Sequence, residues 1–273
     1  MILGRRKRPR APEGPTLEQM RPVSDFVAGV LADLEQRVDV GWNLLDIDAE
    51  AHRMIREAGA TSCYIDYHPS FGGSPFGKVI CTSVNEAVLH GRPYDRVLAN
   101  GDLVSLDFAV EVEGWVADSC VSFVVGQADP EDLQLIEDTR TVMWEGIAQA
   151  RAGNHVGDIG HAIQSAAHRL GYTINRQFGG HGVGRTMHEA PFIANVGTPG
   201  SGVGLTEGMT ITVEPFLSPT TNELLTDERD GWTLLAADGS RGAHAEHTLF
   251  VTDGEPIILT ARPGEEIPVG VRP

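Results

Sequence analysis

Two aspartates lie in a segment with the pattern of a β-hairpin. Residues Gly101–Val125 read GDLVSLDFAVEVEGWVADSCVSFVV, two runs of alternating apolar and small or polar residues around a Glu-Gly pair, which is typical of antiparallel strands joined by a tight turn. Asp107 lies in the first run and Asp118 in the second. A two-residue loop at 112–113 would place them directly opposite each other. A loop one residue later would pair Asp107 with Cys120 and leave Asp118 a diagonal neighbour on the same face.

Paired carboxylates on one sheet face constrain the chemistry of this segment. Opposed side chains lie about 4.5–5.5 Å apart at Cβ, so two carboxylates there repel unless one binds a proton or a cation lies between them. The alternative is that Asp107 and Asp118 are unrelated residues on a solvated face. A metal site would need further ligands from the rest of the chain.

Three segments of the second half offer such ligands. His181 lies in a glycine-rich run, GGHGVG; Glu214 ends the alternating segment TITVE; and Glu246 begins another, EHTLFV. Together with the two aspartates, these oxygen-rich ligands suit two divalent ions that keep open coordination positions. A structural turn is the alternative role for His181. We exclude a dinucleotide site, because no strand–GxGxxG–helix unit is present.

Composition and charge limit the partners and the cellular location that we expect for this protein. The 273-residue chain carries 21 Lys and Arg against 38 Asp and Glu, a formal charge of −17, which makes the body a poor partner for DNA. It has no apolar run long enough for a membrane span and no secretory signal. Three cysteines, an odd number, indicate reduced thiols, so we expect a cytoplasmic protein. We also expect it to be a monomer. Residues 1–15, basic and proline-rich, are expected to form a disordered arm, either a solvated tail or an attachment to an acidic partner such as ribosomal RNA.

Hydrophobic periodicity predicts four helices and several strands. The helices are expected over 16–38, 43–59, 129–153 and about 159–171, and the strands outside the hairpin over 78–82, 173–178, 209–214 and 246–251. Pro22 should kink the first helix or delay its start to about Ser24. The order helix, helix, strands occurs twice. Two such halves would form one central sheet with helices on one side and a site at the seam.

These segments together resemble type I methionine aminopeptidases, within the pita-bread metallopeptidases. The resemblance runs from Thr16 to about Ile267, and its landmarks are CTSVNEAVLHG, SLDFAV, ADSC, GGHGVGRTMHEAP, GMTITVEP and DGWTLLAADGSRGAHAEHTLFVT. It implies an α+β pita-bread fold, in which two pseudo-symmetric αβ halves share a curved antiparallel sheet with helices packed on one side. A single catalytic domain would span 16–267, with a short tail over 268–273.

The resemblance also implies a metal centre. Asp107 would bind one divalent ion, and His181 and Glu214 the other. Asp118 and Glu246 would bridge the two ions. Carboxylate and imidazole ligands accept Co, Mn, Fe or Zn, so the identity of the ions stays open.

The implied reaction removes an N-terminal methionine that has a free α-amine and is followed by a small residue. Glu214 would shuttle a proton from water to the leaving amine. His188 would hydrogen-bond the carbonyl oxygen, and His90 would contact the scissile amide nitrogen. Besides these two histidines, the substrate-binding residues would be Cys63, Tyr67, Cys81, Met187 and Trp232. The alternative for Cys63 and Cys81 is that they are ordinary buried thiols.

Four positions depart from the family pattern: Ala109 and Ser119, where Thr is common, Met187 in place of Phe, and His244 in place of Gln. The loop over 64–77 is longer than usual, and either Phe71 or Phe76 could line the pocket mouth. Two rival functions are weighed against the aminopeptidase. A prolidase of the same fold typically has a large extra N-terminal domain, whereas the core here begins by about residue 16. A non-catalytic binding module generally loses metal ligands, whereas all five matching residues are present.

Overall fold

A computed structural model describes residues 14–69 and 74–273. The helices of these ranges are α1 (Leu17–Arg37), α2 (Leu44–Ala58), α3 (Pro130–Ile147) and α4 (Val156–Leu170). The strands are β1 (Thr61–Ser62), β2 (Cys81–Val84), β3 (Ala87–Leu89), β4 (Leu103–Val112), β5 (Trp115–Val124), β6 (Gly179–Gly182), β7 (Glu189–Ala194), β8 (Thr210–Val213), β9 (Phe216–Leu217), β10 (Leu224–Thr226), β11 (Leu234–Ala236), β12 (Ala243–His244), β13 (Glu246–Phe250) and β14 (Ile257–Ile258).

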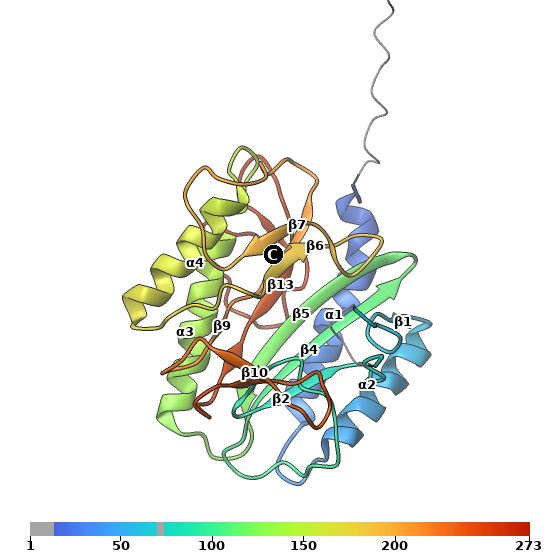
Figure 1. Cartoon of the computed structure of the whole chain (residues 1–273). Coiled ribbons are helices and arrows are strands. Elements are labelled where there is room, and N and C mark those ends of the chain that lie inside the picture. The colour runs from blue at the N-terminus through green and yellow to red at the C-terminus, as the bar shows by residue number, and fades with distance from the viewer. Residues whose placement is uncertain (1–13, 70–73) are drawn as a thin grey trace, which may run out of the picture.

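One antiparallel sheet organises the molecule. Its nine strands include the path β1-β4-β5-β13-β8-β6-β7, with β2 beside β4 and β14 beside β13, while β10-β11-β3 and β12-β9 form smaller sheets. Figure 1 shows α1 alongside β4 and β5, and α3 and α4 side by side at the other half of the sheet. The two αβ units therefore join where β5 pairs with β13.

The first helix runs without interruption through Pro22, so a delayed start near Ser24 is wrong. The Thr16 hydroxyl accepts from the Gln19 amide at 3.2 Å, and the Gln19 side chain accepts from the Thr16 amide at 2.9 Å. This capping box provides hydrogen-bond acceptors for two backbone amides at the start of the helix. The amide that Pro22 lacks would have bonded to Glu18, whose exposure lets water replace it.

Three other predicted boundaries are wrong because tertiary contacts override local pattern. The strand expected at 78–82 begins at Cys81, since the Val79 amide instead bonds to the Asp48 carboxylate at 2.8 Å. The strand expected at 173–178 lies at 179–182, because the Asn175 side chain turns the chain by accepting from the amides of residues 177 and 178. The helix expected to continue to Gly153 ends at Ile147, and Arg151 instead forms an isolated β-bridge with Thr252, two residues after the end of β13.

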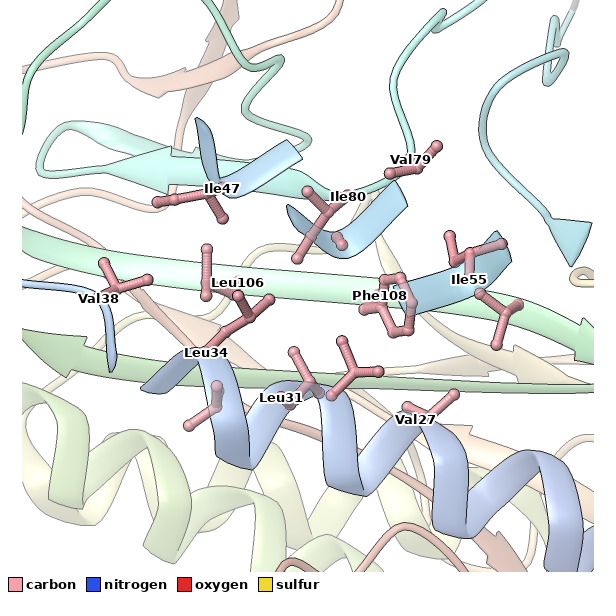
Figure 2. Close-up of a cluster of buried hydrophobic side chains, with 14 of the residues drawn as sticks. Val27, Leu31, Leu34, Val38, Ile47, Ile55, Val79, Ile80, Leu106 and Phe108 are labelled. Carbon is pink, nitrogen blue, oxygen red and sulfur yellow. The ribbon is translucent and has the colours of Figure 1, made fainter. Parts of the chain in front are cut away.

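The core between α1, α2 and β4 orients the site. Figure 2 shows Val27, Leu31 and Leu34 of α1 facing Leu106 and Phe108 of the sheet. Each such buried side chain contributes about 1.5–3 kcal/mol of transfer free energy. Because successive strand residues point to opposite faces, burial of residues 106 and 108 against the helices turns residue 107 to the other face of the sheet.

The structure describes little of the arm predicted at residues 1–15 and all of the tail predicted at residues 268–273. Most of the expected arm over 1–15 lies outside the described residues. The expected tail over 268–273 contains Val271, which is buried, and Arg272, whose amide donates to the Pro256 carbonyl at 2.9 Å. None of the helices in the two described ranges is both long and apolar enough to cross a bilayer.

Candidate metal centre and substrate pocket

The β4–β5 hairpin adopts the second of its two predicted registers. Asp107 pairs with Cys120, and Asp118 pairs with Ala109. The turn is the reason, since Glu113 and Gly114 have φ of 55° and 78°, the left-handed pair of a type I′ turn. The two aspartates are therefore diagonal neighbours on one face.

Glu246 continues this row of side chains across the seam. It pairs with Cys120, which itself pairs with Asp107, so all three side chains leave the sheet on the same face. The first half of the chain thus supplies two carboxylates and the second half a third at the same place.

His181 and Glu214 approach from strands on the other side of β13. The Nε2 atom of His181 lies 3.4 Å from a Glu214 carboxylate oxygen and 3.9 Å from one of Asp118. Ligand atoms of Asp118, His181 and Glu246 all lie within 4.8 Å of one another. His181 lies on strand β6, so the alternative of a structural turn residue does not hold.

The glycines beside His181 allow the strands to meet closely. A Cβ atom at Gly180 would lie 2.2 Å from the Thr212 carbonyl oxygen on β8, and one at Gly182 would lie 2.3 Å from the Ala190 carbonyl oxygen. Such contacts exclude any larger residue. The sequence pattern GGHG therefore reflects the close backbone approach that brings the imidazole to the carboxylates.

The protonation state of His181 suits a metal ligand. Its Nδ1 atom lies 3.0 Å from the Gly182 carbonyl oxygen, which can only accept, so Nδ1 carries the hydrogen and Nε2 presents a lone pair. Burial, together with nearby His188, lowers the pKa of His181 to about 3. The neutral ring with a free Nε2 is the ligand form, and this Nδ1–H contact with a carbonyl is the support that metal-bound histidines usually have.

The carboxyl groups are costly to ionise without a cation. Burial raises the pKa of Asp107, and burial followed by repulsion from neighbouring carboxylates raises those of Asp118 and Glu246 well above normal. Burial likewise raises the pKa of Glu214 to about 8. Four oxygen-donor side chains and one neutral imidazole around a shared space fit hard divalent ions.

Tyr64 is a site residue that the sequence analysis missed. Its hydroxyl donates to Asp107 Oδ1 at 2.5 Å and lies 3.3 Å from Asp118 Oδ1. Burial and the adjacent carboxylates raise its pKa well above normal, so it remains a neutral donor. Its place next to Cys63 in a segment expected to form the pocket was the available signal.

A cavity of about 530 Å³ opens onto the metal centre. Its apolar wall includes Phe76, whose ring meets that of Trp232 edge to face at a centroid distance of 5.3 Å. Of the residues expected to bind substrate, those that line it are His90, His188, Tyr67, Cys81, Met187 and Trp232. Cys63 is not among the lining residues and packs behind them. Phe76 is thus at the place expected for one of two phenylalanines, and the other, Phe71, lies outside the described residues.

The two histidines expected to bind substrate, His90 and His188, both line this cavity, and different features hold them in place. His90 has a left-handed φ of 53°, a conformation that is uncommon outside glycine and occurs at functional sites. Burial lowers its pKa to about 4. The ring of His188 lies edge to face with that of His181 at 4.4 Å, and its Nδ1 is 3.1 Å from the Tyr67 hydroxyl.

Three neighbouring polar residues have separate roles. His247 points to the helix side, where it contacts Thr260 at 3.0 Å and Glu265 at 3.1 Å. Glu189 accepts hydrogen bonds from the amides of residues 185 and 186 and so shapes the loop before β7. His244 is buried with its Nε2 4.0 Å from Glu214, and within the described ranges this atom has no hydrogen-bond partner.

The chain is similar in both sequence and structure to known metallopeptidases. The model of metallopeptidase family M24 matches residues 18–253. Methionine aminopeptidase 1 of Mycobacterium tuberculosis is 40% identical over 267 residues, which is 95% of this chain and 97% of that protein. The crystal structure of methionine aminopeptidase from Rickettsia prowazekii has a TM-score of 0.86 and 34% identity, and the alignment covers 91% of this chain and 99% of that one.

A more distant structure shares the fold alone. The prolidase from Pyrococcus horikoshii has a TM-score of 0.70 at 17% identity, and the alignment covers 92% of this chain but 63% of the prolidase. The expected pita-bread fold, an α+β architecture with a curved antiparallel sheet, is confirmed by the closer similarities.

Proposed function

This chain belongs to metallopeptidase family M24, and we propose on that premise that it removes the initiator methionine from proteins whose second residue is small. The observation that carries the proposal is the opening of an apolar cavity directly onto the cluster of four carboxyl groups and one imidazole. Relatives named methionine aminopeptidase, similar over nearly their whole length, support this function over that of a prolidase.

Two divalent ions, of Co, Mn, Fe or Zn, are the proposed cofactors. Asp107 would hold one and His181 with Glu214 the other, while Asp118 and Glu246 would bridge them. When bound, the ions would supply a nucleophilic water at neutral pH and polarise the scissile carbonyl.

Glu214 is the proposed proton carrier. The Thr212 hydroxyl donates to its Oε1 at 2.8 Å, which orients the carboxyl group and leaves Oε2 toward His244. Its carboxyl lines the cavity that the peptide would enter, which is where a general base has to lie. Glu214 would accept a proton from the attacking water and deliver it to the amine that leaves.

The two histidines would orient the peptide. The Tyr67 hydroxyl can donate to Nδ1 of His188, which leaves Nε2–H as the donor that this cavity-lining ring can offer. We assign this N–H to the carbonyl oxygen of the substrate, where negative charge develops. His90 would contact the scissile amide nitrogen. Met187, Cys81 and Trp232 would surround the methionine side chain, because sulfur and aromatic groups suit a thioether.

Hydrolysis of Met-Ala-Ser tests the function. Chelator-treated protein is given each divalent metal in turn and offered Met-Ala-Ser, N-acetyl-Met-Ala-Ser and an X-Pro peptide. We expect cleavage of Met-Ala-Ser alone, abolished by the chelator and restored by metal. Preferential cleavage of the X-Pro peptide would identify a prolidase, and absence of cleavage with any metal would favour a binding module.

We also propose that the protein acts as a monomer in the cytoplasm on emerging nascent chains. The basic residues within the first ten positions support a contact with ribosomal RNA, because the rest of the chain is acidic. Co-sedimentation with ribosomes tests this contact. The full chain should sediment in low salt, and a chain lacking residues 1–13 should not.

A further inference from the structure

We propose that Tyr64 is a positioning residue for the metal centre, and that its phenol provides the hydroxyl that residue 109 lacks. This inference rests on the proposed function only in treating Asp107 and Asp118 as metal ligands. Tyr64 would act by orienting these carboxylates.

The contacts of the phenol define this role. Its oxygen lies 2.5 Å from Asp107 Oδ1 and 3.3 Å from Asp118 Oδ1, so one donor lies between the two carboxylates. A hydroxyl donates one hydrogen, which goes to the nearer oxygen, and each carboxylate keeps further lone pairs for a cation. The residue is buried, with 7% of its surface exposed, and such a hydrogen bond is stronger than one at an exposed site.

The backbone that presents Tyr64 is tied to the strand that carries Asp107. Ser62 of β1 pairs with Val110 of β4, and the Cys63 amide donates to the Ala109 carbonyl at 3.2 Å. The ring of Tyr64 also lies edge to face with that of Phe76 at 5.7 Å. The hydroxyl is therefore held in place from both its backbone and its ring.

Position 109 explains why a phenol is needed there. Residue 109 is the next side chain after Asp107 on the same strand face, and it lies directly opposite Asp118. A hydroxyl on residue 109 would be near both carboxylates. Ala109 has none, is fully buried, and belongs to the same apolar cluster as Tyr64.

Metal affinity measured by calorimetry tests the proposal without reference to peptide cleavage. Tyr64→Phe removes the hydroxyl and keeps the ring. We expect its dissociation constant for Mn²⁺ or Co²⁺ to rise by about 10–100-fold, the usual effect of losing a group that orients a metal ligand. The control is Tyr172→Phe, which removes a phenol that donates to Asp138 at 2.8 Å outside the site and should leave metal affinity unchanged.

A compensating variant separates a local role from general damage. Tyr64→Phe combined with Ala109→Ser removes one hydroxyl and adds another at the position opposite Asp118, and we expect most of the lost affinity to return. Wild-type affinity in Tyr64→Phe would overturn the positioning role, and a double variant no better than the single one would overturn the exchange with position 109. Failure of the wild type to cleave Met-Ala-Ser would refute the peptidase function and leave these binding results interpretable.

Discussion

Metal binding to this protein should expel protons. The perturbation is titration of the chelator-treated protein with Mn²⁺ or Co²⁺ at pH 5, 6 and 7. Glu214, with its pKa raised to about 8, carries a proton throughout this range in the metal-free fold. A metal ligand must be deprotonated, so the ion has to displace that proton.

The magnitude follows from the number of protons displaced. One displaced proton makes the affinity rise about tenfold, or ~1.4 kcal/mol, for each pH unit. Between pH 5 and 7, Glu214 alone should tighten binding about 100-fold, or ~2.7 kcal/mol. Asp118 and Glu246, whose pKa values burial and neighbouring carboxylates also raise well above normal, would steepen this slope. His181 adds nothing in this window, because with a pKa of about 3 it is already neutral.

The raised pKa of Glu214 also determines how the stability of the metal-free fold depends on pH. A carboxyl whose folded pKa is raised penalises the metal-free fold above the unfolded pKa, here from the normal value of 4.5 up to about 8. Metal removes that penalty, so the gain in Tm on adding metal should grow by about 5–11 °C between pH 5 and 7, since 1 kcal/mol shifts Tm by about 2–4 °C at this size. Calorimetry in two buffers of different ionisation enthalpy counts the protons directly. Affinity independent of pH, with no proton released, would refute this account of the site.

Three further perturbations give distinct outcomes. Asp118→Asn should lower metal occupancy and activity together, measured by elemental analysis and Met-Ala-Ser cleavage, and an active metal-free variant would contradict its role as a ligand. Glu265→Gln should destabilise the fold by ~3 kcal/mol at pH 7 in urea unfolding, because His247 and Arg262 outweigh the effect of burial and hold its pKa at about 2. That difference should shrink as the pH falls from 4.5 toward 2, and a constant difference would contradict it. Deletion of residues 1–13 should leave small-peptide cleavage unchanged, whereas a large loss would place the arm in the folded body.

The helices were largely predictable because their signals are local. The caps at Thr16, Asn43 and Gly59 lie where sequence placed them. Strand limits were less predictable, because they depend on contacts with residues far away in the sequence. The strand expected at 78–82 begins late because the side chain of Asp48 on α2 binds the amide of Val79 before the chain reaches the sheet.

The candidate metal ligands could be identified from sequence, but the neighbouring residues that contact them could not. Asp107 and Asp118 lie on the alternating strands of one hairpin, whose period indicates a shared face, whereas Glu246 joins that face through the pairing of β13 with β5. The contact of Tyr64 with Asp107 depends instead on the pairing of the two-residue strand β1 with β4. So short a strand carries no periodic signal. His244 was noted as unusual, and only the fold shows its Nε2 buried near a carboxylate.

The departures from the family pattern divide between the carboxylates and the pocket, and this division predicts separable effects. The hydroxyl of Ser119 donates to the carbonyl oxygen of Glu246 at 2.7 Å, and His244 lies 4.0 Å from Glu214. Met187 instead lines the cavity wall. Because a buried carboxylate is sensitive to its neighbours and an apolar wall selects by shape, His244→Gln should change the metal dissociation constant and leave the preference for Met-Ala-Ser over norleucine-Ala-Ser unchanged. Met187→Phe should do the reverse. If His244→Gln shifted peptide preference at unchanged metal affinity, His244 would belong to the pocket and not to the support of the metal centre.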